Sequence, residues 1–303
     1  MRYTQWEVLR FIRRAFVALL LSSSSARADV IADWNATALS TVTSSEQRPA
    51  YASRAMALVH VAMFEAMNFI EGAYVPRLLV KPPMPIGVSS EAAAAAAAYY
   101  VLVQLYPAQG AALEALLRDS VATIPDGGEK SSGLIAGRHL GANVYAVLAS
   151  DRISDGSRTG PMFGPMTWNP AVARLIEARR LKPIEAARMH ALISVAVSDI
   201  YAARRDVDYA RGREHPCAPC AVGAAILLIL ESELGSASVP KAAATGTGTS
   251  DAVRGWTPVR DYADEWPSGQ INGGTDSRGS IRAGEEMGRK IGLRALTYFR
   301  SIE

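Results

Sequence analysis

Residues 51–70 read YASRAMALVHVAMFEAMNFI, an unbroken run in which apolar side chains recur on nearly every face of a helix. A helix that is apolar on most of its faces is usually buried among other helices. Pro49 stands just before this run and suits the first turn of a helix, where its missing N–H needs no partner. The run therefore predicts a helix that is buried inside an α-helical bundle.

Helical periodicity continues on both sides of this run. Glu91–Leu105 contains seven consecutive alanines, which favour a helix and allow close approach of a neighbour. Proline and glycine predict loops at Tyr74–Ser90 and Asp155–Pro170, and Trp168 in the second loop is expected to plug the bundle. Alternation of period two is missing, so strands should be scarce. Further helices are predicted at Val30–Leu39, Ala108–Ile124, Lys130–Leu148, Ala171–Arg180, Lys182–Tyr201, Cys220–Leu234 and Gly284–Tyr298.

The N-terminus has the pattern of a secretory signal peptide. Three arginines between residues 10 and 14 precede the short apolar run Ala15–Leu21, and a small-residue end follows at Ala28. The alternative is a membrane anchor, for which the apolar run is too short. We therefore expect a signal peptide over residues 1–28, a periplasmic or secreted protein, and no membrane span after cleavage. Residues 29–303 are then expected to form a single all-α domain, a helical bundle.

Composition narrows the classes of partner. The net charge is only +3 over 303 residues, so the chain lacks the electrostatic footprint of a nucleic-acid-binding protein. No group of His, Cys, Asp and Glu has metal-ligand spacing, so no metal site is expected. His60 and His190 lie in apolar helices and are predicted to be core histidines, whereas His139 is predicted to lie on a helix surface. The small, polar segment 236–255 is predicted to be a mobile linker.

Several segments resemble, in the same order, the bacterial vanadium-dependent haloperoxidases, which are grouped with the type 2 phosphatidic acid phosphatases. Single segments are weak signals, but their common order covers most of the chain after residue 28. The resembling segments are Ala32–Asn35, Ala57–Asn68, Lys182–Arg188, Pro216–Cys220 with the apolar helix ending at Gly235, Gly273–Gly274 and Gly284–Gly292.

The resemblance implies a helical-bundle fold and a site for phosphate or vanadate. In that family a lysine and two arginines hold the oxyanion, a histidine of the second motif is the general acid, and a histidine of the third motif attacks phosphorus or coordinates vanadium. This sequence departs from the pattern. Pro219 stands at the second-motif histidine, while Gln270 and Asp276 stand at the third-motif arginine and histidine. The first motif has no clear match, so phosphatase or haloperoxidase activity is expected to be lost or altered.

Two substitutes for the missing catalytic residues are available, His215 and Asp276. The alternatives are an exposed histidine in a polar turn and a carboxylate that repels an oxyanion. Glycines free backbone N–H groups, and arginines donate to oxyanions, so residual binding of vanadate or phosphate is conceivable; the plainer interpretation is a turn with solvated arginines. The candidate anion-binding residues are Arg211, Arg213, Gly273, Gly274 and Arg278.

Cys217 and Cys220 are the only cysteines, in the order Cys-Ala-Pro-Cys. This spacing also occurs in thiol-redox motifs, where a helix N-terminus acidifies the first thiol. Those motifs normally follow a strand, and no strand pattern precedes Cys217. A structural disulfide, or two reduced structural thiols, is the other interpretation, and an oxidising compartment would favour the disulfide.

Overall fold

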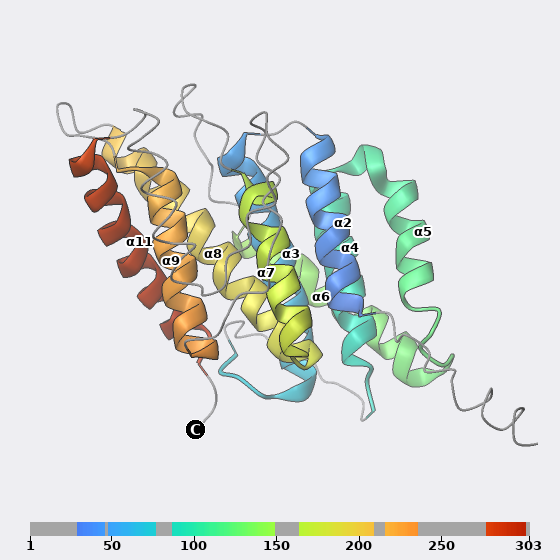
Figure 1. The fold of residues 1–303 in the computed structure, drawn as a ribbon. Helices are drawn as coiled ribbons and strands as arrows, with labels where there is room; N and C mark the ends of the chain where they lie inside the picture. Colours follow the sequence, from blue (N-terminus) through green and yellow to red (C-terminus); the bar gives the residue numbers. More distant parts are fainter. Residues whose placement is uncertain are drawn as a thin grey trace, which may run out of the picture.

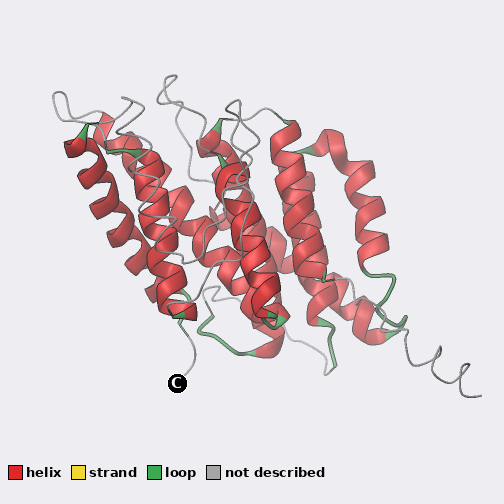
Figure 2. Ribbon diagram, viewed as in Figure 1, coloured by secondary structure: helices red, strands yellow, loops and turns green. Residues whose placement is uncertain are grey.

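The computed structural model describes residues 29–45, 48–76, 87–148, 164–208, 216–235 and 277–300, with the backbone alone at 205–208. These ranges contain helices, turns and one isolated bridge at Tyr74, and no strand (Figure 2). The predicted signal peptide and the predicted linker at 236–255 lie outside the described residues. The helices are α2 (Val30–Ser44), α3 (Pro49–Glu71), α4 (Ser90–Leu105), η1 (Pro107–Gln109), α5 (Gly110–Ser120), α6 (Gly128–Leu148), α7 (Pro165–Arg179), α8 (Pro183–Asp208), α9 (Ala218–Leu234) and α11 (Arg278–Tyr298).

Helix α3 is buried inside the bundle, as the sequence predicts. It contacts α2, α4, α6, α7 and α8, and almost every side chain from Ala52 to Asn68 is buried. The helix ends where Gly72 takes a left-handed conformation with φ of 64°, which glycine adopts without steric cost. Figure 1 shows α9 and α11 side by side at one edge of the bundle and α5 at the opposite edge.

Two helix pairs pack unusually closely through glycine. In the first pair, Gly133, Gly137 and Gly141 of α6 face the alanine-rich helix α4, and a Cβ on Gly137 would stand 2.1 Å from the Ala93 carbonyl oxygen. In the second pair, a Cβ on Gly288 of α11 would stand 2.1 Å from the Ala221 carbonyl oxygen of α9. A side chain at these positions would push the helices apart, so glycine sets the spacing.

Helix α7 begins earlier than the sequence predicts. The predicted loop 155–170 gives way to helix at Pro165, which stands at the first position and pre-sets the backbone there. Pro170 lies inside this helix, and its missing N–H is tolerated because the flanking side chains are anchored. Trp168 is 1% exposed and Asn169 is fully buried. The prolines and glycines predicted a helix start that is too late. The burial of this segment in the bundle outweighs its low local helix propensity.

Other helices are also longer than predicted. Helix α2 continues beyond Leu39 to Ser44, α8 continues beyond Tyr201 to Asp208, and α11 begins at Arg278 instead of Gly284. Ser277 caps α11 by accepting a hydrogen bond from the Ser280 N–H at 3.0 Å, a common device for satisfying the first free N–H groups. Among the described helices, none combines the length and the apolar character that crossing a membrane requires.

Candidate functional site

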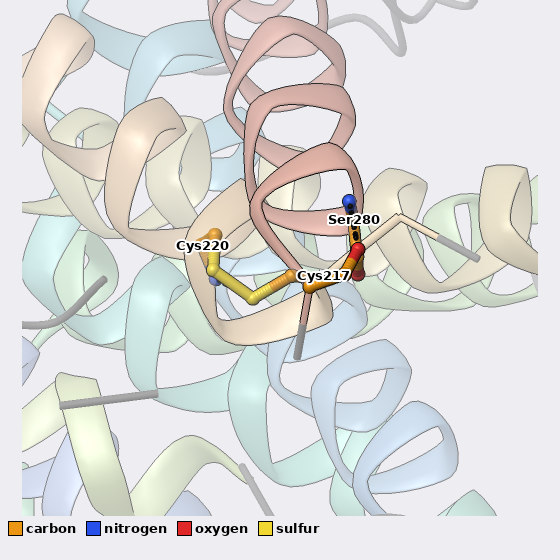
Figure 3. The surroundings of a disulfide bond; sticks show 4 residues. Cys217, Cys220 and Ser280 are labelled. Atoms are coloured by element: carbon orange, nitrogen blue, oxygen red, sulfur yellow. Dashed lines mark hydrogen bonds between the residues drawn. A yellow bond between two sulfur atoms is a disulfide. The ribbon is translucent and has the colours of Figure 1, made fainter. Parts of the chain in front are cut away.

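The starts of α9 and α11 lie together. The Cys217 N–H donates to the Ser280 carbonyl oxygen at 3.0 Å (Figure 3). Gly284 faces Cys217, and Gly288, one turn further along α11, faces Ala221, one turn further along α9. The two helices therefore run parallel, and both positive dipole ends are at the same end of the bundle. Free N–H groups and helix dipoles make such an end favourable for an anion.

A disulfide joins Cys217 and Cys220 across the first turn of α9, with the two Cα atoms 5.3 Å apart (Figure 3). The Cys217 sulfur also accepts a hydrogen bond from the Cys220 N–H at 3.2 Å. Both cysteines are only 2% exposed, and they form a small apolar cluster with Ile281 of α11. The thiol-redox alternative requires an exposed thiol at Cys217, so this burial argues against it.

Pro219 occupies the second position of α9 and is buried. A helix needs no N–H at this position, so proline fits the scaffold. It carries no group that can transfer a proton. At the place where the resemblance expects a general acid, the described structure therefore holds a residue that cannot act as one.

Only part of the predicted site falls within the described ranges. Arg278 is the first residue of α11 and is exposed. Arg204, which lies near the end of α8, has a buried Nε without a hydrogen-bond partner among the described residues. A buried guanidinium N–H that lacks a protein partner suits a water or an anion. The following candidates lie outside the described residues, so their convergence is untested: Arg211, Arg213, His215, Gly273, Gly274 and Asp276.

A second polar constellation, in the core, joins four helices. The His60 Nδ1 of α3 lies 2.6 Å from the Ser194 hydroxyl of α8, and its Nε2 lies 3.0 Å from the Asn35 Oδ1 of α2. The Asn35 and Asn169 side chains exchange two hydrogen bonds, of 3.0 and 2.8 Å, which brings in α7. The His190 ring of α8 stacks on His60, with ring centroids 4.8 Å apart. We call these five residues the histidine junction.

The hydrogen bonds define the state of His60. Asn35 Oδ1 is an acceptor, so His60 Nε2 donates to it, and Nδ1 then accepts from the Ser194 hydroxyl. This is a neutral imidazole. Burial lowers the pKa of His60 well below its usual value, and the neighbouring His190 lowers it further. Burial also lowers the pKa of His190 to about 4. Both rings are therefore uncharged at neutral pH.

The histidine junction suits a structural role. His60, Asn169 and Ser194 have no exposed surface, and both nitrogens of His60 are already hydrogen-bonded within the protein. The sequence predicts His60 and His190 as core histidines, and their burial confirms this; His139 is exposed, as predicted. Sequence reasoning missed the asparagines and the serine, since Asn169 stands in a segment that we predicted as loop.

The sequence matches no protein-family model, and no curated protein is significantly similar to it. The structure, in contrast, is similar to the crystal structure described as that of the first bacterial vanadium-dependent iodoperoxidase. The TM-score is 0.68 at 13% sequence identity, over 88% of this chain and 96% of that chain. The chain therefore has the all-α fold of a vanadium-dependent haloperoxidase.

Proposed function

We propose that this chain is an exported protein of the haloperoxidase fold that has lost or altered the phosphatase or haloperoxidase reaction and retains weak oxyanion binding. The observation that carries the proposal is the joined start of α9 and α11. There the Cys217 N–H bonds to Ser280, and the first turn of α9 holds Pro219 where the resemblance expects the acid histidine.

The residues fit an anion better than a coordinated vanadium cofactor. Coordination needs an imidazole in the third motif, and this sequence has Asp276 there. The positive dipole ends of α9 and α11 and the guanidinium of Arg278, in contrast, offer positive charge to any small oxyanion. We therefore propose no reaction step at vanadium, and we expect phosphate and vanadate to bind as simple anions.

Calorimetric titration of orthovanadate into the chain from Asp29 onward tests the proposal. We expect one-to-one binding that weakens about fivefold in Arg278→Ala, the effect of roughly 1 kcal/mol for an exposed charge contact. Arg289→Ala is the matched control, because it removes one exposed arginine three turns further along the same helix, where Arg289 contacts Glu285.

Three outcomes separate the possibilities. Binding that is equally weak in both variants would show nonspecific attraction. The absence of heat at millimolar vanadate, from a sample that melts cooperatively, would eliminate the oxyanion site. Turnover of a phosphate monoester or of halide and peroxide, lost in Arg278→Ala, would instead mean that His215 or Asp276 substitutes for the missing histidines.

A further inference from the structure

The disulfide stands where α9 and α11 meet at their starts. Cys217 is the residue that caps α9. Its N–H bonds to Ser280, and its carbonyl oxygen is so close to α11 that a Cβ on Gly284 would stand 2.4 Å away. The N–H and the carbonyl group of Cys217 therefore both contact α11. A movement of Cys217 changes the contact between the two helices.

The first turn of α9 is buried, and the disulfide adds a covalent link to its hydrogen bonds. Cysteine is a weak substitute for the Ser, Thr, Asp or Asn that normally caps a helix, and Pro219 has no N–H to offer. The sulfur of Cys217 accepts a hydrogen bond from the Cys220 N–H. The two cysteines and Ile281 form their own small cluster, beside the main core. The disulfide is the covalent link within this cluster, so it contributes to the order of the turn.

Reduction changes the space that the sulfurs need. A disulfide holds its sulfurs about 2.05 Å apart, whereas non-bonded atoms rest at about 3.5–4.0 Å. The two thiols must therefore separate by roughly 1.5 Å. Both cysteines are buried, and Gly284 leaves no gap beside the Cys217 carbonyl. Within α11, the side chain that packs with the two cysteines is Ile281, so the separating thiols press on this contact.

We propose that the Cys217–Cys220 disulfide is a redox clamp: when formed, it orders the joined starts of α9 and α11, and its reduction loosens them. The chemistry is thiol–disulfide exchange with a dithiol donor. The donor loses two electrons and two protons and becomes a disulfide, while the Cys217–Cys220 bond breaks and both sulfurs become thiols. Because the sulfurs are buried, the donor reaches them only after local opening of the first turn of α9. If the proposed function holds, anion affinity falls on reduction.

Hydrogen–deuterium exchange measured by mass spectrometry tests the clamp independently of any ligand. The oxidised chain, the chain reduced with a phosphine, and Cys217→Ala/Cys220→Ala are compared. Relative to the oxidised chain, we expect at least tenfold faster exchange at the starts of α9 and α11 in the reduced chain and in the double variant. Peptides of α3, α4 and α6 should be unchanged. Reoxidation with glutathione disulfide should restore slow exchange to the wild type and leave the double variant unchanged.

Two results would overturn the clamp. One is unchanged exchange at the starts of α9 and α11 after reduction; the other is acceleration throughout the bundle, which would make the disulfide a general stabiliser. Vanadate titration of the same samples distinguishes the two proposals. Local loosening with a several-fold drop in affinity supports both, whereas local loosening with no vanadate binding in either redox state supports the clamp and rejects the oxyanion function.

Discussion

The histidine junction makes the stability of the fold depend on pH. In the unfolded chain a histidine has a pKa of about 6.5, whereas burial lowers the pKa of His190 to about 4. Between these values the unfolded chain binds a proton that the folded chain does not, so stability is lost as the pH falls from 6.5 towards 4. His60 contributes with the same sign, because burial and the neighbouring His190 lower its pKa as well.

The magnitude follows from the shift. Each pKa unit corresponds to about 1.4 kcal/mol. The lowered pKa of His190 alone therefore reduces the free energy of unfolding by about 3 kcal/mol between pH 7 and pH 4. His60 adds to this loss, and the two rings titrate as a coupled pair. Typical domains have only 5–15 kcal/mol of stability. We therefore expect the chain to unfold, or to lose most of its stability, at about pH 4 to 5.

Urea unfolding at steps from pH 7 to pH 4 measures the effect. His190→Leu removes one titrating ring and should reduce the total loss of unfolding free energy by roughly 3 kcal/mol. His139→Leu is the matched control, because this exposed imidazole of α6 is in contact with water in both states. Parallel pH profiles for the wild type and His190→Leu would refute the reasoning. Carboxylates elsewhere would then account for all of the unfolding free energy that is lost in acid.

Three substitutions test the packing. Gly288→Ala should lower the unfolding free energy by about 1–3 kcal/mol, because its Cβ would stand 2.1 Å from the Ala221 carbonyl oxygen; urea unfolding measures this. Gly223→Ala in α9 is the control, because no atom of the described residues lies within 4 Å of its Cβ, and the gain in helix propensity should stabilise the fold by up to about 1 kcal/mol. Arg188→Leu leaves the half-buried Glu233 without its bidentate partner and should cost about 3 kcal/mol in thermal unfolding. Full stability in Arg188→Leu would show that water replaces the pair.

The helices could be predicted because their signals are local. The apolar run of α3 and the alanines of α4 indicate burial directly in the sequence. The ends of α3 and α9 coincide with Gly72 and Gly235, both with positive φ, which is a common stop signal. Helix starts were harder to predict. Ser277 caps α11 earlier than the periodicity suggests, because a polar first turn adds nothing to an apolar pattern.

The histidine junction could not be predicted from the sequence. Asn35 and Asn169 are 134 residues apart, and so are His60 and Ser194. Periodicity reports which face of one helix is buried and carries no information about which polar side chains meet across helices. Asparagine and serine are also common in turns and caps, so their presence alone does not indicate a core network.

The candidate site was predicted from motif order, and the structure tests that prediction only in part. The motif order correctly anticipated the fold, since the structure is similar to that of a vanadium-dependent iodoperoxidase. It also selected Cys217, while Arg278 was predicted from its closeness to the glycine pair; the two residues lie at the neighbouring starts of α9 and α11. The connections that carry most candidate residues lie outside the described ranges, so the arrangement of the arginines stays a prediction.

The fold and the chemistry place separate demands on the start of α9. The scaffold needs small residues along the contact with α11, and it has them in Ala221, Gly284 and Gly288. It needs nothing from the side chain at position 219 beyond compatibility with the second residue of a helix, and proline satisfies that requirement. Under the proposed function, proline at this position removes the acid without loss to packing. The side chain at position 219 can therefore change without cost to the bundle, which agrees with a fold that is kept at 13% identity.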